Sequence, residues 1–152
     1  MVARSPYYSD RNKEKGIKPA DVYRVYALDR ISDIQDTGKT FKMKKDFDIN
    51  HYFKGCCGVI TSNEPIQRIV LLAYGGFADY LRTLPLHESQ REIEGDDEST
   101  LFEYHLKPTF DFYQLVLAQG DQVEVLEPES VRSEMRNFAK NMLDYYTWKA
   151  VS

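Results

Sequence analysis

The sequence has few cysteines, and their arrangement excludes two kinds of fold. Among 152 residues only Cys56 and Cys57 are cysteines. An unstrained disulfide needs Cα atoms at least about 4.4 Å apart, whereas neighbouring Cα atoms are about 3.8 Å apart. A disulfide framework and a cysteine-rich zinc site are therefore excluded, and we expect a reduced, cytoplasmic protein. The simpler interpretation of the pair is space filling beside Gly55 and Gly58, and a redox role is the alternative.

Long apolar runs are also missing. No run approaches the roughly 18–20 residues of a membrane helix. The first twenty residues are too charged for a secretory signal. We therefore expect neither membrane insertion nor export.

The sequence lacks the common motifs for metals, phosphates and catalysis. Its three histidines, His51, His87 and His105, have no paired spacing, and no glycine pair precedes Lys-Ser or Lys-Thr. The acidic run at 92–98 lacks the spacing of a calcium loop. We expect no metal site, no cofactor and no catalytic residue.

One polar cluster allows an alternative. His87, Glu88, Ser89 and Gln90 place an imidazole, a carboxylate, a hydroxyl and an amide side by side. A small hydrolase using His87 and Ser89 needs a positioned base and an oxyanion hole. No nucleophile-elbow glycines surround Ser89, and adjacent residues of an extended strand point to opposite faces. The sequence therefore favours a structural or ligand-touching turn.

The charge is unevenly distributed. Residues 1–55 contain twelve Lys and Arg against eight Asp and Glu, whereas residues 56–152 contain eight against sixteen. Such a division is typical of two modules, of which the first attracts anions or nucleic acid more strongly. Ordinary solvation of lysine-rich loops is the alternative.

Residues 1–55 show a weak β pattern. The segment 9–19 is polar and predicts a long loop. Residues 22–28 are β-branched and aromatic and predict a strand, with 31–35 as a second strand. Residues 46–53 predict a short helix. Two strands alone leave unpaired edges and too little apolar area for an independent sheet.

The pattern is clearer from residue 67 onward. Strands are predicted at 68–74, 89–94, 101–107 and 122–126, and helices at 77–84, at 109–120 with Thr109 as the cap, and from Pro128 onward. This βαββαβ order plus a terminal helix predicts an α+β fold, a ferredoxin-like sandwich with helices on one face of an antiparallel sheet. Its edges need cover, from the last helix or from a second copy of the chain.

Arg24 and Tyr26 lie on one side of the strand predicted at 22–28. A guanidinium beside an aromatic ring can pair with a phosphate and offer a surface on which a base stacks. The alternative is an arginine that pairs with Asp29 or Asp33 on the rim of a barrel.

The order and spacing of several short motifs resemble those of WYL-domain proteins. The family's strand pair R-x-F-R-L-D-R-I has its counterpart in Arg24-Val-Tyr-Ala-Leu-Asp-Arg-Ile31, and its helical link in residues 47–53. Residues 73–146 are similar to the C-terminal extension of the family, called WCX. Landmarks of the extension are Tyr80-Leu81, Pro85-Leu-His-Glu-Ser-Gln90, Leu117-Ala-Gln-Gly120, Val123-Glu-Val-Leu-Glu-Pro128 and Val131-Arg132.

The resemblance implies a cytoplasmic bacterial transcription regulator without catalytic activity. In such proteins an Sm-like WYL barrel senses a ligand, with single-stranded nucleic acid as the favoured class, and the extension helps to dimerise and relays the signal. The residues carried over by position are Arg4, Arg24, Tyr26 and Arg30 for the effector, and His87, Ser89 and Gln90, the H-x-S-Q motif, for a second candidate site. A homodimer and a single-stranded DNA or nucleotide-like effector are the expected partners. A pure dimerisation module without ligand is the alternative.

Two departures from the family pattern concern the N-terminal part. The Trp-Tyr-Leu tripeptide that names the domain precedes a stretch like Val2-Ala3-Arg4 in relatives, so we expect it, and the helix-turn-helix that reads DNA, to belong to a longer regulator. Ala27 stands where the family has a second arginine. The predicted organisation is a partial WYL segment at 1–55, which is an incomplete SH3/Sm-like β-barrel with its linker helix, a linker at 56–66 and the ferredoxin-like WCX domain at 67–152.

Overall fold

The structure is a computed structural model that describes residues 1–4, 14, 23–40, 42, 45 and 47–148. The chain divides into two compact units, Met1–Phe47 and Asp48–Ser152. The loop predicted at 9–19 lies outside the described residues except for Glu14. The two units are described separately below.

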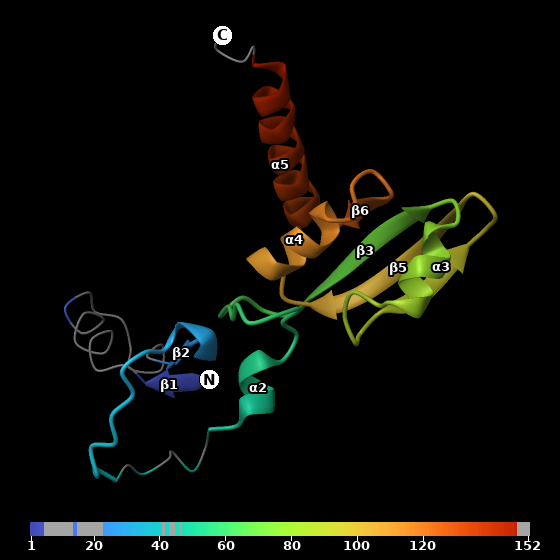
Figure 1. Cartoon of the computed structure of the whole chain (residues 1–152). Helices are drawn as coiled ribbons and strands as arrows, with labels where there is room; N and C mark the ends of the chain where they lie inside the picture. The colour runs from blue at the N-terminus through green and yellow to red at the C-terminus, as the bar shows by residue number, and fades with distance from the viewer. Residues whose placement is uncertain (5–13, 15–22, 41, 43–44, 46, 149–152) are drawn as a thin grey trace. The chain divides into compact units, whose positions relative to one another are not determined.

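The N-terminal unit is built on a pair of short antiparallel strands (Figure 1). Strand β1 (Val2–Arg4) pairs with β2 (Tyr23–Val25), and a 3₁₀ helix, η2 (Leu28–Arg30), follows. The strand predicted at 31–35 is wrong, because this segment contains neither helix nor strand. Asp33 has a φ of 55°, which an extended strand does not allow, so β2 pairs with β1 instead.

The second unit begins with a short helix, as predicted. Helix α2 (Ile49–Phe53) is capped by Asp48, whose carboxylate accepts a hydrogen bond of 2.9 Å from the Asn50 N–H. The remaining elements, in chain order, are β3 (Gln67–Tyr74), α3 (Phe77–Thr83), β4 (Arg91–Gly95), β5 (Ser99–Leu106), α4 (Phe110–Leu117), β6 (Val123–Glu127) and α5 (Glu129–Thr147). Each element predicted after residue 67 is confirmed, with bounds shifted by up to three residues.

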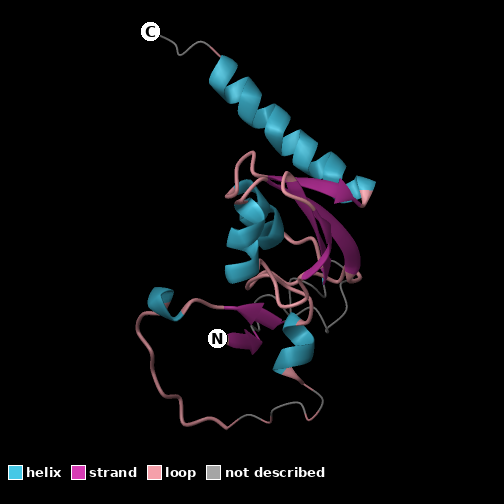
Figure 2. Ribbon diagram, turned by 90° about the vertical axis from the view of Figure 1, so that its right-hand side faces the viewer, coloured by secondary structure: helices cyan, strands magenta, loops and turns pink. Residues whose placement is uncertain are grey.

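The four strands form one antiparallel sheet in the order β4-β5-β3-β6. In this order β5 lies between β3 and β4, and β3 lies between β5 and β6, so the two β-α-β units are interleaved. Helices α3 and α4 contribute to the same core as one face of the sheet (Figure 2). The α+β class is confirmed.

The core lies between these two helices and the sheet. Alternate residues of β5, among them Phe102 and Tyr104, are buried, whereas Glu103 and His105 point to the other face. Strand β3 is nearly buried on both faces, as its continuous apolar run predicts, since Val70 is only 4% exposed. Thr109 does start α4, but the predicted side-chain cap is wrong, because its hydroxyl makes no capping hydrogen bond. Among the residues that the structure describes, this buried hydroxyl has no hydrogen-bond partner.

The two edges of the sheet differ. All five residues of β4 are exposed, and a register shift between Glu92 and Glu94 marks a bulge. At the other edge α5 packs against β6, and Val131 of α5 joins the core. The predicted cover of an edge by the last helix is therefore found at β6.

Candidate functional site

The predicted effector residues are gathered in the N-terminal unit. Arg24 lies in the middle of β2 opposite Ala3, Tyr26 directly follows the strand, and Arg30 ends η2. Arg4 occupies β1 opposite Tyr23. Four residues that are separated in the sequence by the segment 5–22 thus belong to one two-stranded sheet and the turn after it.

Tyr26 is hydrogen-bonded to Met1. The Met1 amino group donates to the Tyr26 carbonyl at 2.9 Å, and the Tyr26 N–H donates to the Met1 carbonyl at 2.7 Å. The Arg24 guanidinium donates to the Tyr23 carbonyl at 3.3 Å. Its side chain is exposed.

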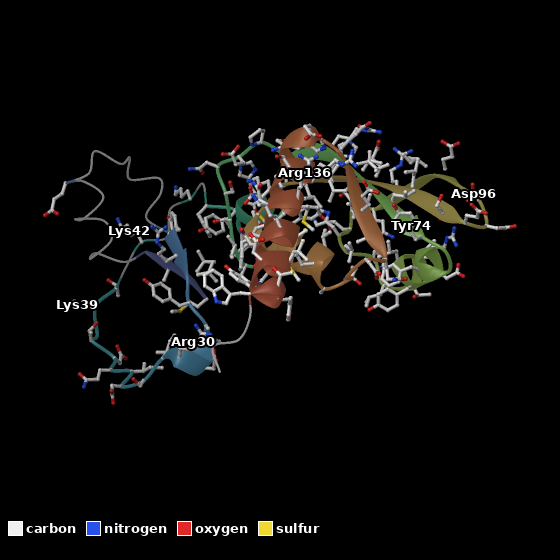
Figure 3. All side chains as sticks on the ribbon, turned by 90° about the horizontal axis from the view of Figure 1, so that it is seen from above. Arg30, Lys39, Lys42, Tyr74, Asp96 and Arg136 are labelled. Atoms are coloured by element: carbon white, nitrogen blue, oxygen red, sulfur yellow. The ribbon has the colours of Figure 1, made fainter. Side chains whose placement is uncertain are left out.

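Further cations lie on the same unit. Arg30 is exposed and makes no ion pair among the residues that the structure describes. Lys39 and Lys42, on the segment after η2, are exposed as well (Figure 3).

The second candidate site, His87 to Gln90, is a turn and not an extended strand. The strand predicted to begin at Ser89 begins only at Arg91, so the strand argument against a His87–Ser89 contact does not apply: the His87 Nδ1 lies 2.8 Å from the Ser89 Oγ. The Ser89 N–H also donates to Nδ1 at 3.1 Å, so this nitrogen is an acceptor and the ring proton sits on Nε2. Partial burial lowers the pKa of His87, which favours that neutral form.

Ser89 and Gln90 extend the β4–β5 ladder with their side chains. The register pairs Arg91 with Glu103, which places Gln90 opposite Tyr104 and Ser89 opposite His105. The Ser89 Oγ accepts from the His105 N–H at 2.9 Å. The Ser89 hydroxyl thus accepts the hydrogen bond that a backbone carbonyl would accept if β4 continued past Arg91 alongside β5.

The amide of Gln90 joins three elements. Its Oε1 accepts from the Tyr104 hydroxyl at 2.8 Å and from the Leu86 N–H at 3.1 Å, and its Nε2 donates to the Leu81 carbonyl at 2.7 Å. In a continuing helix the Leu81 carbonyl would accept from residue 85, but Pro85 has no N–H. Gln90 supplies the missing donor. Burial raises the pKa of Tyr104, which keeps its hydroxyl protonated as a donor.

Two hydrogen bonds hold the segment before β3 against the end of β5 and the start of α4. The Asp111 carboxylate accepts from the Ile60 N–H at 2.8 Å, and the Lys107 ammonium donates to the Ser62 carbonyl at 2.8 Å. Cys57 lines a shallow hollow of about 360 Å³ beside Asp111. Burial, with smaller contributions from Cys56 and Asp111, raises the pKa of Cys57 to about 12. The thiolate that redox chemistry needs is therefore disfavoured at Cys57.

The sequence model of the WCX domain matches residues 65–143, which is more than half of the chain and runs from the start of β3 well into α5. The chain belongs to the WCX domain family. No curated protein matches it.

The WCX domain contains a groove that sequence reasoning missed. This hollow of about 460 Å³ lies between β6 and α5, and its lining residues are Leu117, Gly120, Val123, Glu124, Val125, Arg132, Met135, Arg136, Ala139 and Met142. Most of these side chains are apolar. The sequence signal for this groove is the apolar stripe of the last helix. The stripe is longer than one small domain can cover, so part of it is left beside an open surface.

Within the ranges given above, no three His, Cys, Asp or Glu side chains are grouped so that they could hold a metal ion. No helix of the described chain is both long and apolar enough to cross a membrane.

Proposed function

We propose that this chain is the sensing and pairing region of a bacterial transcription regulator of the WYL type. The observation that carries the proposal is the WCX domain at 65–143, preceded by a basic unit with a short β-sheet. The WCX domain pairs two chains, and the N-terminal unit binds an anionic effector, with single-stranded nucleic acid as the favoured class. The region works in the cytoplasm and performs no catalysis.

The proposed effector site consists of Arg4, Arg24, Tyr26 and Arg30. The arginines bind phosphates by charge-assisted hydrogen bonds, and the tyrosine offers a ring on which a base stacks. Arg30 is exposed, so a phosphate can approach it from solvent.

A salt titration with a labelled single strand tests this proposal. For single strands the logarithm of affinity falls with the logarithm of salt concentration with a slope of about −0.7 per phosphate contact. Three arginine contacts predict a slope of about −2, which is a loss of roughly 20-fold between 50 and 200 mM salt. Arg24→Ala and Arg30→Ala should each weaken binding and reduce the slope by about 0.7.

Arg91→Ala is the matched control, because it removes an exposed arginine from β4 in the other unit. It should leave both affinity and slope unchanged. Binding that is equally strong in the Arg24 and Arg30 variants contradicts the site assignment. A hydrolase screen with Ser89→Ala as its control should detect no activity in either protein.

The second candidate function is a pure dimerisation module without ligand. Exposed aromatic residues at the end of α5 favour it, because they suit a protein partner. Light scattering that shows a dimer, together with no binding of single-stranded DNA at low salt, would select this function over the first.

A further inference from the structure

The apolar stripe of α5 is covered by its own domain over only half of its length. The stripe consists of Val131, Met135, Phe138, Met142 and Tyr145, at spacings of four and three residues, which place them on one face of a helix. Val131 is buried, Met135 packs against the core, and the Phe138 ring lies 5.6 Å from the ring of Tyr113. After Phe138 every described residue of α5 is exposed.

The uncovered half of α5 projects from the WCX domain (Figures 1 and 2). At 1.5 Å per residue, the part after Phe138 extends for about 14 Å. Its large apolar side chains, with their exposed fractions, are Met142 45%, Leu143 63%, Tyr145 76%, Tyr146 86% and, just past the helix, Trp148 78%. A contiguous apolar patch of this kind marks an interaction site.

The groove and the uncovered patch are parts of one surface. On its groove side α5 contributes Ala139 and Met142, together with residues of the preceding turns. Leu143 lies four residues after Ala139 and Tyr146 lies four after Met142, so both continue the same side of the helix. Within the described part of the chain, the end of α5 is apolar and exposed, and the groove beside it is apolar and open.

We propose that a second copy of this chain docks here, with the two α5 helices antiparallel about a two-fold axis near Ala139. In this arrangement Leu143 and Tyr146 of each copy enter the groove of the other, so one contact is made twice. The small side chain of Ala139 lets the helices approach closely at the crossing. Met135 and Met142 adapt their shape to the incoming side chains, and Arg132 and Arg136 can stack on an aromatic ring.

The area that this docking buries is sufficient for a specific dimer. A fully buried aromatic side chain contributes about 150–250 Å². Tyr146, Leu143 and Met142, which are 86%, 63% and 45% exposed, together with the groove surface that the partner's side chains cover, contribute roughly 500 Å² per chain. Two copies together reach about 1,000 Å², the lower limit for a specific interface. The proposal rests on the proposed pairing function and adds the surface that performs it.

Sedimentation equilibrium of the full chain tests the surface. The parent should be a dimer, and Leu143→Glu and Tyr146→Glu should each raise the dissociation constant more than about tenfold, because each places a carboxylate in an apolar groove. The matched control is Leu84→Glu, which changes a leucine of similar exposure, 57%, at the end of α3 and should leave the constant unchanged. Circular dichroism should show that all variants keep the parent's helix content.

A cross-link tests the position of the axis. A residue on a two-fold axis meets its own copy, so Ala139→Cys should give a disulfide-linked dimer under mild oxidation, whereas Asn137→Cys, on the opposite side of α5, should not. The parent chain, oxidised in the same way, measures the contribution of Cys56 and Cys57.

The outcomes separate the surface from the pairing function. A parent that is monomeric at about 100 μM, well above the dissociation constants of specific interfaces, overturns both, and the patch then serves a different protein. A dimer that both glutamate variants leave unchanged, or that Ala139→Cys does not cross-link, overturns the α5 surface but leaves pairing intact.

Discussion

The Gln90 amide should stabilise the WCX domain through its three hydrogen bonds, and a mutant cycle can measure this. Gln90→Met keeps the length of the side chain but removes the partners of the Tyr104 hydroxyl, the Leu86 N–H and the Leu81 carbonyl. An unsatisfied buried polar group costs about 1–3 kcal/mol. Because Gln90 is only half-buried, the lower end applies, and the free energy of unfolding should fall by about 3 kcal/mol.

Tyr104→Phe perturbs the same network in a different way. It removes one donor and leaves the Gln90 oxygen its bond from Leu86, so the expected loss is about 1 kcal/mol. In the Gln90→Met background the Tyr104 hydroxyl already lacks its partner. There Tyr104→Phe removes an unsatisfied group and should be neutral or stabilising by up to about 1 kcal/mol. The coupling energy between the two positions is then about 1–2 kcal/mol.

Urea unfolding followed by far-ultraviolet circular dichroism is the assay. The control is Gln122→Met, since the exposed side chain of Gln122 bonds to its neighbour Asp121; it should change the unfolding free energy by less than about 0.5 kcal/mol. If the losses of Gln90→Met and Tyr104→Phe add to within about 0.5 kcal/mol in the double variant, the two side chains do not act together and the reasoning is refuted.

Two further changes test other contacts of the second unit. Because the pKa of His87 is lowered in the folded state, the unfolded chain binds a proton more readily, so the free energy of unfolding should fall as the pH drops below about 6.5. His87→Asn keeps an acceptor for Ser89 and should remove this part of the pH dependence between pH 7 and 5, as measured by urea titrations. An unchanged pH dependence in the variant would assign it to other groups. A methyl group on Gly58 would collide with the Asp111 carboxylate, so Gly58→Ala should lower the unfolding free energy by about 1–2 kcal/mol. Gly76→Ala, which meets open space, should change it by less than about 0.5 kcal/mol, and equal effects of the two alanines would contradict the clash.

The second unit was predictable because its local patterns agree with its packing. The apolar run at 68–74 has the composition of a strand buried on two faces, and the alternation at 101–107 has the period of a strand with one wet face. Burial follows both patterns. A protein in which composition and tertiary packing demand the same structure can be interpreted from its sequence.

The N-terminal unit was harder because its short strands depend on long-range pairing. Residues 31–35 have β-branched side chains, but the backbone of Asp33 is left-handed and the partner of β2 lies some twenty residues earlier in the chain. Local propensity does not identify such a partner. Each of these strands has only three residues, which is too short for the alternation of apolar and polar side chains to be recognised in the sequence.

The role of the H-x-S-Q motif depended on geometry that sequence spacing does not carry. His87 and Ser89 meet because the chain turns between them, whereas in an extended strand they would lie on the same face about 6.6 Å apart. Gln90 is needed because Pro85 removes a donor from the end of α3. The proline is visible in the sequence, but the approach of residue 90 to the Leu81 carbonyl follows only from the fold.

The exposed rim of β4 limits how far self-association can proceed. A flat, unpaired strand is a template on which further chains add end to end, and fibril growth begins in this way. The bulge interrupts the row of free donors and acceptors, and Glu92 and Glu94 on either side of it repel an identical incoming strand. Concentrated protein should therefore remain as discrete particles and not elongate into cross-β filaments.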